Sequence, residues 1–470
     1  MGAMQHGPER PSSCEGSERR RIAAWSIMAL CMIASVTLTQ LRSPLFAGVL
    51  ALGFWGALLA YLVSFAELRR SLWAALPIWG LYCGLVARFT FTWRGHVIEP
   101  PLLGTDGQRF VIWANQWLLE RRHVGWSLFT FAIHPGEAAG RSIGLEGAGR
   151  WVLHAEVALC GALAAVFLFA LVRDRGVPRA VAWLSALFFA FALGPWAMAT
   201  AIDTYIVSVF LFVVFLRELV RCLESAPRVP WVLALVSGIA LCISLENVYL
   251  PLLFLGLFPF VRRDVRRPWT HALGYAAVTG AVVLAGLAVQ RLCAGPPERI
   301  PDTIVHHVER FSSLASLVDP GTLLRVAFHE TIGSVVAQRS RTIVLYSRGL
   351  PGVLDGVTVL YLGLLVALVV AGARSARAGE LARSPFAWTL AATLVLRHGF
   401  MTAYAPSETI LFSAPSIAVL AVLLGCGAAA LHGRKLLWYG AAFLALDLLL
   451  LLSNGEFLVR AFASARKDFF

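Results

Sequence analysis

Long apolar segments alternate with short arginine-rich breaks along nearly the whole chain. Each segment has roughly the twenty residues that an α-helix needs to cross about 30 Å of hydrocarbon. Because backbone N–H and C=O groups find no water inside a bilayer, each segment is predicted to be helical. The pattern predicts about thirteen spans, at residues 22–41, 45–65, 72–91, 152–172, 181–199, 204–221, 230–246, 248–262, 270–292, 353–373, 385–404, 409–431 and 435–452.

The composition agrees with this pattern. Hydrophobic residues make up 58% of the chain and charged residues 14%, whereas soluble domains carry about 25% charged residues. The predicted fold class is therefore an all-α, polytopic transmembrane helical bundle. The eight cysteines lie mostly within predicted spans and show no paired spacing, so no disulfide framework is predicted.

The net charge of +13 comes from arginines that occupy every second gap between spans. By the positive-inside rule these gaps, and the N-terminus, face the cytoplasm. Membrane lipids with anionic head groups account for this charge without any nucleic acid partner. Lysine occurs only at Lys435 and Lys467, a bias typical of a bacterial protein of high-GC origin. The predicted location is the bacterial cytoplasmic membrane.

Two segments, 92–151 and 293–352, are much longer than ordinary connections and emerge on the outer face. They are predicted to contain interfacial helices at 110–119, 304–317 and 323–336, the last two separated by a break at Asp319, Pro320 and Gly321. The chain accordingly divides into a cytoplasmic tail (1–21), a transmembrane hairpin (22–71), a core region with the first loop (72–292), the second loop (293–352), C-terminal transmembrane helices (353–452) and a tail (453–470).

Ionisable side chains that are far apart in the sequence converge near the outer face in this arrangement. Polar groups are expensive where a helix meets hydrocarbon, so several at one depth indicate a functional site. The main members of this set are Asp106, His134, Asp203, Glu246, Arg397 and Glu408.

Five short motifs carry all of these residues except Arg397. The first long loop contains Thr-Asp-Gly-Gln-Arg-Phe at 105–110 and, further on, His134 followed by Pro135. Ala-Ile-Asp-Thr-Tyr at 201–205 opens one apolar helix, and Ser-Leu-Glu-Asn at 244–247 precedes another. Tyr-Ala-Pro-Ser-Glu at 404–408 leads into a late helix.

Together these motifs resemble the GT-C superfamily of integral-membrane glycosyltransferases, in particular the protein O-mannosyltransferase-like members, over about residues 72–431. The resemblance implies transfer of a sugar from a polyprenyl-phosphate carrier to a lipid, glycan or protein acceptor on the outer side. It also implies that Asp106 stands in the place of the catalytic acid of the first loop. The neighbour of Asp106 is Gly107, where many members have a second acidic residue, and the hairpin at 22–65 precedes the loop as an addition.

Glycosyl transfer needs a carboxylate that accepts the proton of the attacking hydroxyl, and cations that hold the departing phosphate. Asp106 is the candidate general base, a role worth roughly 10² to 10⁴ in rate. The alternative is that Asp106 caps the helix that follows it.

Arg397 and His398 interrupt an apolar span and are candidates for the phosphate, since the guanidinium fork can bind two phosphate oxygens. A snorkelling arginine is the alternative at this depth. Arg348 is a weaker candidate for the same role.

Glu246 and Asn247 lie between two spans with little room for a solvated loop, so we expect an inward contact with sugar or acceptor. Asp203, which has Tyr205 nearby, directly precedes one helix, and Glu408 directly precedes another. Capping and the helix dipole also explain an acid at such a position. His134 is expected at most to position the first loop. Asp447 lies inside a late span and is expected to form a buried hydrogen bond with a neighbouring helix.

Histidines and acids in the second loop raise the question of a metal. Their spacing matches no strong ligand signature, so no metal site is predicted, while assistance by a divalent cation stays open. Two other functions also stay open: a multi-span transporter or lipid flippase, and an inactive GT-C-like partner subunit, for which Gly107 is the reason. The residues in question are His306, His307, Glu309, His329 and Glu330.

Overall fold

The computed structural model describes residues 12–89, 91–93, 96–98, 116–117, 127–145, 147–225, 230–262, 265, 267–294, 319–328, 356–375, 384–404, 413–429 and 431–467. Within these residues the chain is helical apart from one small antiparallel ribbon, in which β1 (Phe91–Trp93) pairs with β2 (His96–Ile98). The predicted all-α class is confirmed.

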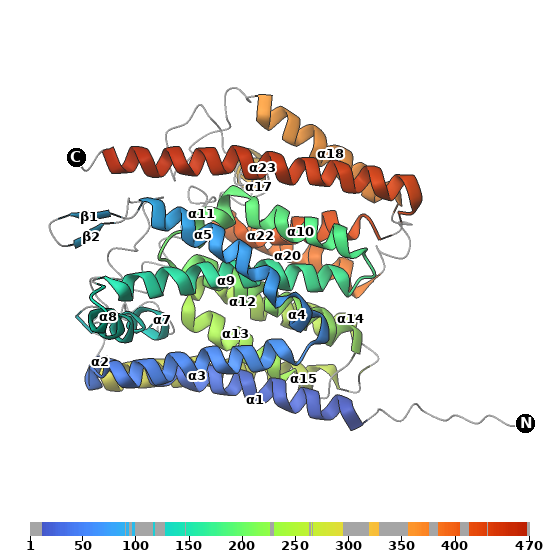
Figure 1. The fold of residues 1–470 in the computed structure, drawn as a ribbon. Coiled ribbons are helices and arrows are strands. Elements are labelled where there is room, and N and C mark those ends of the chain that lie inside the picture. Colours follow the sequence, from blue (N-terminus) through green and yellow to red (C-terminus); the bar gives the residue numbers. More distant parts are fainter. Residues whose placement is uncertain are drawn as a thin grey trace, which may run out of the picture.

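The helices run side by side in one bundle (Figure 1). They are α1 (Ser12–Ser35), α2 (Leu38–Leu41), α3 (Pro44–Val63), α4 (Ala66–Ser71), α5 (Ala75–Phe89), α7 (Ser127–Phe131), α8 (Ile133–Ser142), α9 (Ala148–Arg173), α10 (Arg179–Phe191), α11 (Leu193–Ala199), α12 (Thr204–Ser225), α13 (Trp231–Ile243), α14 (Tyr249–Val261), α15 (Pro268–Ala294), α17 (Pro320–Phe328), α18 (Gly356–Ser375), α20 (Pro385–Tyr404), α22 (Ala414–Cys426) and α23 (Gly433–Lys467), with short 3₁₀ turns η1 (Leu72–Ala74) and η3 (Leu245–Val248).

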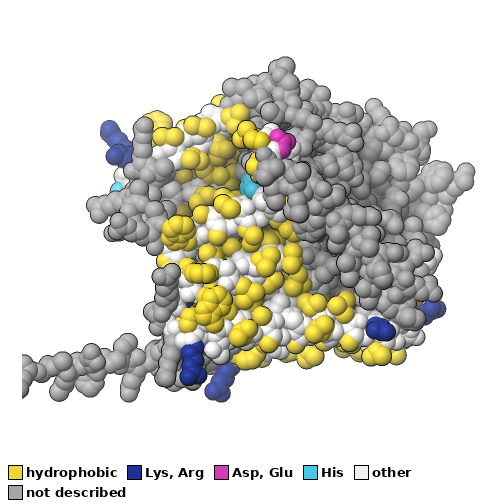
Figure 2. Space-filling model, turned by 180° about the vertical axis from the view of Figure 1, so that it is seen from behind, with side chains coloured by type: hydrophobic (Ala, Val, Ile, Leu, Met, Phe, Trp, Pro, Cys, Tyr) yellow, Lys and Arg dark blue, Asp and Glu magenta, His cyan; other side chains and the backbone are white. Residues whose placement is uncertain are grey.

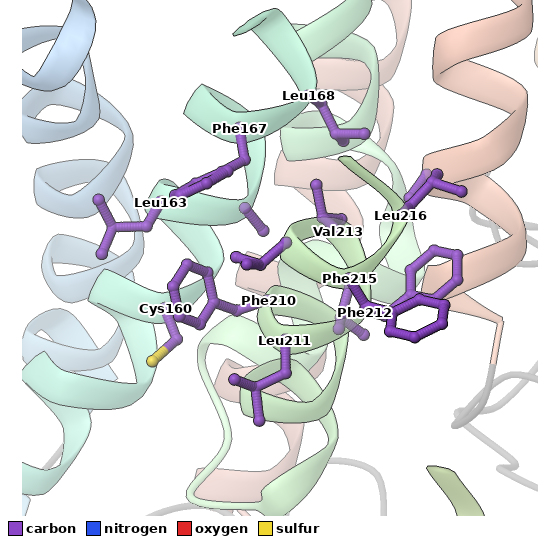
Figure 3. Close-up of a cluster of buried hydrophobic side chains, with 14 of the residues drawn as sticks. Cys160, Leu163, Phe167, Leu168, Phe210, Leu211, Phe212, Val213, Phe215 and Leu216 are labelled. Carbon is purple, nitrogen blue, oxygen red and sulfur yellow. The ribbon is translucent and has the colours of Figure 1, made fainter. Parts of the chain in front are cut away.

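The centre of the bundle is α9. Every residue from Cys160 to Val172 is buried, which is the property of a helix that is apolar on all sides and surrounded by others. Its inner part packs against α12, where the Phe167 and Phe210 rings meet edge to face at 5.7 Å. Figure 3 shows side chains of α9 facing those of α12 in this layer.

Four described helices are long and apolar enough to cross a membrane: Pro44–Val63, Ala148–Arg173, Pro268–Cys293 and Gly433–Arg460. A fifth crossing results if α10 and α11, which are bent by 66° at their junction, are taken as one. The helices α13, α14 and α22 have 13 residues each, about 20 Å. The helices indicate a membrane protein, whereas the predicted thirteen crossings stay a prediction.

The surface agrees with a membrane environment. Large apolar side chains on several helices are exposed, for example Leu45 (79%), Leu52 (75%) and Val395 (75%). Figure 2 shows a face on which hydrophobic side chains cover much of the described surface, with Lys and Arg at its edges. Such a surface is unfavourable in water and suited to lipid.

The span predicted at 181–199 is not one continuous helix, because the helix breaks at Ala192. This residue has extended dihedral angles, φ −62° and ψ 141°. The cause lies in Pro195, which has no N–H to donate to the carbonyl of Phe191 four residues earlier and whose ring crowds that carbonyl.

Other helices supply the hydrogen bonds that the break removes. Asn454 Nδ2 of α23 donates to Phe191 O at 2.8 Å, and the Tyr82 hydroxyl of α5 donates to Ala190 O at 2.9 Å. Buried carbonyls without a partner are costly, so these two contacts make the break tolerable.

Several boundaries differ from those expected. The first helix begins at Ser12 rather than at 22, and α9 begins at Ala148 rather than at 152. The last helix continues to Lys467, beyond the end of the span expected at 435–452.

The first long loop contains two helices, α7 and α8, that the hydropathy pattern does not predict. Of the helix expected at 110–119 only residues 116 and 117 lie in the described part; they form a turn, and Trp117 has φ +56°. A helix through Trp117 is therefore wrong, because right-handed helices need negative φ.

In the second loop, α17 begins at Pro320, three residues before the helix expected at 323–336. It confirms a helix at the start of that range. Asp319 caps it: its carboxylate oxygens accept from the backbone N–H groups of Gly321 and Thr322, both at 3.1 Å. The helix expected at 304–317 lies outside the described residues.

Arginines from several breaks gather at one end of the bundle. Arg217 donates to Asp174 at 3.1 Å, and Glu218 on the same helix lies 3.6 Å from Arg21. Arg175 pairs with Glu224. We call this the arginine end; it is the end predicted to face the cytoplasm.

Candidate functional site

The buried face of α20 is polar. Thr389, Thr393 and Arg397 follow one another at helical spacing and are 0%, 1% and 4% exposed. Both threonine hydroxyls donate to carbonyls one turn earlier, which satisfies them inside an apolar setting. This face packs against α12, α14 and α22, and α17 of the second loop packs against the same helix.

Arg397 points into the bundle. Its guanidinium carbon lies 5.1 Å from the centre of the Tyr249 ring, and Tyr249 is 2% exposed. The Phe400 ring lies 6.3 Å from the same tyrosine. A snorkelling arginine would reach toward the membrane surface, so this alternative does not describe the side chain. A guanidinium over an aromatic face is stabilised by about 0.5 to 2 kcal/mol.

The Asn247 side chain ties η3 to its neighbours. Its Nδ2 donates to Ala240 O at 2.8 Å and to Ser208 Oγ at 3.2 Å. The turn exists because α13 ends where Ser244 adopts extended angles, φ −153° and ψ 130°. Tyr249 follows Asn247 by two residues. The turn η3 therefore brings Asn247 close to the aromatic ring that the Arg397 guanidinium contacts.

Glu246 is half-buried in this turn, and its Oε2 accepts from the Ser244 hydroxyl at 3.4 Å. Asp203 is 4% exposed, and its Oδ1 accepts from the N–H and hydroxyl of Thr204, at 2.6 and 3.3 Å. Both contacts are with Thr204, the first residue of α12, whereas a capping side chain accepts from the second or third helical N–H, so capping by Asp203 stays a prediction. Tyr205 is half-buried one residue into the same helix.

His398 differs from its neighbour Arg397. Its Nδ1 lies 2.8 Å from Leu394 O one turn earlier on the same helix, so this nitrogen donates to that carbonyl. The ring is therefore held against α20. Of the two residues predicted for the phosphate, Arg397 is the one that the structure directs into the bundle.

His134 lies elsewhere, on α8, which packs mainly against α9 and α3. Its ring stacks on Trp117 with centroids 3.5 Å apart and planes 4° apart. Nearby, Glu137 Oε1 accepts from Gly149 N at 3.1 Å, which ties α8 to the start of α9. The role of His134 in positioning the first loop agrees with this stack.

The predicted residues Asp106, Arg348 and Glu408 lie outside the described residues, as do the histidines and acids of the second loop considered for a metal. Within the described part of the chain, no group of three or more His, Cys, Asp or Glu side chains could hold a metal ion.

Two residues of the site were missed from the sequence, Tyr249 and Ser208. Tyr249 left a signal, since it follows the Glu246 and Asn247 pair by two residues at the start of an apolar helix. Ser208 left none, because a single serine in an apolar helix usually bonds to its own backbone.

The fold and this group of residues define an all-helical membrane protein with a buried arginine and amide near the end of the bundle opposite the arginine end. No protein-family model matches the chain, and no curated protein matches it either.

Proposed function

We propose that the protein is a membrane glycosyltransferase that moves a sugar from a polyprenyl-phosphate carrier to a lipid, glycan or protein acceptor at the outer face of the cytoplasmic membrane. The observation that carries the proposal is the buried Arg397, held over Tyr249 beside Asn247. A cation fixed inside an apolar bundle is suited to an anionic ligand such as the phosphate of a lipid carrier.

The division of roles follows from chemistry. Asp106 accepts the proton of the acceptor hydroxyl as the oxygen attacks the anomeric carbon. The bond from that carbon to the phosphate oxygen breaks, and Arg397 stabilises the negative charge that develops there. One displacement of this kind inverts the anomeric centre. Asn247 and Glu246 supply hydrogen bonds for the hydroxyl groups of the sugar or acceptor.

The test measures transfer of radiolabelled sugar from a panel of polyprenyl-phosphate donors in membranes that contain the chain. We expect a labelled product with the unmodified protein and at least about a hundredfold less with Asp106→Asn, because a general base is lost. Arg397→Ala should lower transfer strongly, whereas Arg291→Ala, which removes an exposed arginine at the end of α15, should leave it unchanged.

Transfer that is equal with Asp106→Asn and the unmodified protein would remove Asp106 from the mechanism. Absence of transfer from every donor, with folded protein in the membrane, would contradict the transferase and favour the inactive partner subunit or a carrier.

A transporter is the second candidate, and a specific observation favours it. Asp447 is 2% exposed in the middle of α23, and neither of its carboxylate oxygens has a hydrogen-bond partner among the described residues. The same helix runs beside the break between α10 and α11. Buried acids and interrupted helices are recurring features of ion-coupled carriers.

A further inference from the structure

Five tryptophans with exposed side chains stand at the starts of helices from separate parts of the chain. Each belongs to the first six residues of a helix or to the 3₁₀ turn η1 before α5. The other described tryptophans are buried or half-buried. We call the five the tryptophan girdle; they are Trp73 (75% exposed), Trp231 (42%), Trp269 (57%), Trp388 (58%) and Trp438 (74%).

The first two members lie at the arginine end. The turn η1, with Trp73, follows α4, and the Phe65 ring at the start of α4 lies 4.3 Å from the Arg217 guanidinium carbon. Trp231 is the first residue of α13, which follows the C-terminus of α12. Since Arg217 and Glu224 lie in the second half of α12, both tryptophans belong to this end.

The other three members lie at the same end. The start of α15 follows Arg262, which donates to the carbonyl of Leu223 in the last turn of α12 at 3.0 Å. At the start of α20, the Arg175 guanidinium carbon lies 4.4 Å from the centre of the Phe386 ring. The helix α23 follows α22, and the last turn of α22 packs against the last turn of α9, the helix that leads into Arg175. All five tryptophans are therefore at one end of the bundle.

The girdle fits the thickness of a head-group layer. Trp231 is the first residue of its helix, whereas Trp438 is the sixth residue of its helix. Five positions correspond to about 8 Å along a helix axis, and the layer between hydrocarbon and water is roughly 5 to 8 Å thick on each side of a bilayer. Indoles are enriched in this layer because they combine an apolar ring with one N–H donor.

Exposed arginines accompany the girdle. Arg70, Arg267 and Arg434 are exposed, and each stands two to four residues before a girdle tryptophan. No described side chain forms an ion pair with any of these three, whereas Arg217, deeper in the same end, is paired with Asp174 at 3.1 Å. Figure 2 shows Lys and Arg side chains at the edges of the hydrophobic face. Because the three guanidinium groups are exposed, they can donate to anions outside the bundle.

We propose that the tryptophan girdle and these three arginines form a surface that selects anionic phospholipid in one leaflet of the membrane. The guanidinium groups donate to phosphate oxygens, and the indoles lie between the head groups and the acyl chains. A nucleic acid or an acidic protein would pair with the arginines but would not account for the exposed indoles beside them. The surface is separate from the Arg397 group and does not depend on the proposed transfer reaction.

The test uses the purified full-length chain in nanodiscs with equal amounts of phosphatidylglycerol and phosphatidylethanolamine of the same acyl chains. After mild delipidation, mass spectrometry measures the ratio of the two retained lipids. We expect phosphatidylglycerol to be enriched about fivefold, the effect of one basic residue on an anionic head group. The triple variant Arg70→Gln, Arg267→Gln and Arg434→Gln should lower the enrichment to less than about twofold.

A second triple variant is the matched control: Arg42→Gln, Arg141→Gln and Arg291→Gln. It also removes three positive charges from exposed positions, but these lie near the ends of α2, α8 and α15, away from the girdle. It should keep the enrichment. Equal loss in the two triple variants would show that net charge alone attracts the lipid and would overturn the proposal, as would equal retention of both lipids by the unmodified protein.

Fluorescence quenching tests the depth of the girdle independently. The variant Trp73→Leu, Trp269→Leu and Trp438→Leu removes three exposed indoles, and unchanged elution in size-exclusion chromatography reports its fold. The fluorescence that this variant loses should be quenched more strongly by a lipid with a nitroxide on its head group than by one with a nitroxide at the end of an acyl chain. Stronger quenching from the bilayer centre would overturn the placement of the girdle among head groups.

Discussion

Asn454 Nδ2 donates a 2.8 Å hydrogen bond to the carbonyl oxygen of Phe191, the group that Pro195 leaves without its helical partner. Through this contact the last long helix of the chain holds the break between α10 and α11. The break in turn sets where α11 ends and where α12 begins; Asp203 of the candidate site directly precedes α12, and Ser208 lies on it.

Asn454→Ala should therefore destabilise the fold by about 1 to 3 kcal/mol, the cost of leaving a buried carbonyl unsatisfied. Unfolding in SDS, followed by circular dichroism, measures the change. Ser453→Ala, at the half-buried neighbouring position, is the control and should change stability by less than about 0.5 kcal/mol. Equal stabilities of the two variants would show that the contact does not hold the break.

The sequence could predict the class of fold because hydropathy reports burial in lipid directly. It also marked Arg397 and His398 together, since either one interrupts the apolar run. It could not separate them: residues next to each other on a helix point in directions about 100° apart, and only the packing of α14 and α12 shows that Arg397 is the inward one.

The same limit applies elsewhere. Pro195 was visible in the sequence and is sufficient to break a helix, but the long apolar segment outweighed it in the prediction of one span. The role of Asn247 depends on Ser208, which lies on a different helix. Contacts of this kind require the tertiary arrangement.

Tyr249 tests whether the ring under Arg397 matters for the proposed reaction. Tyr249→Leu should lower transfer about fivefold to thirtyfold, because a buried cation–π contact of up to about 2 kcal/mol is lost and the guanidinium is no longer held. Tyr249→Phe keeps the ring and should retain most of the transfer. Steady-state kinetics with the active donor make the measurement, and equal losses in both variants would contradict a role for the ring.

A buried contact at the arginine end should contribute more to stability than an exposed one. The Tyr61 hydroxyl donates to Glu218 Oε1 at 2.7 Å, with Tyr61 0% and Glu218 4% exposed. A double-mutant cycle with Tyr61→Phe and Glu218→Ala should give a coupling energy of about 1.5 to 3 kcal/mol, typical of hydrogen bonds to charged groups.

The exposed pair Arg460 and Glu456 is the comparison, since its side chains are 71% and 41% exposed. Its coupling energy should be about 0.3 to 0.5 kcal/mol. Similar values for both pairs would mean that water reaches the Tyr61 contact.

Gly425 of α22 packs closely against two neighbouring helices. A Cβ atom at Gly425 would lie 2.8 Å from Val172 Cγ1 and 2.9 Å from Ser185 Cβ, whereas one at Gly280 would meet no atom within 4 Å. Gly425→Ala should destabilise by about 1 to 3 kcal/mol through overpacking. Gly280→Ala should be neutral or stabilising, since alanine favours a helix by about 0.5 to 1 kcal/mol. The midpoint of SDS unfolding compares the two variants. Unchanged stability of Gly425→Ala would show that α9 and α10 can shift away from α22.

The variant Asp447→Leu separates the two candidate functions. It should make the fold more stable in either case, but only a carrier should lose its activity. Both of its carboxylate oxygens are buried without a hydrogen-bond partner among the described residues, so Asp447→Leu removes an uncompensated polar group and should stabilise the fold by about 1 to 3 kcal/mol. If the protein is a transferase served by Arg397, sugar transfer should persist in this more stable variant. If the acid binds a coupling ion in a carrier, uptake into proteoliposomes should be lost while stability rises. A variant that is less stable would contradict both expectations and would assign Asp447 a structural partner.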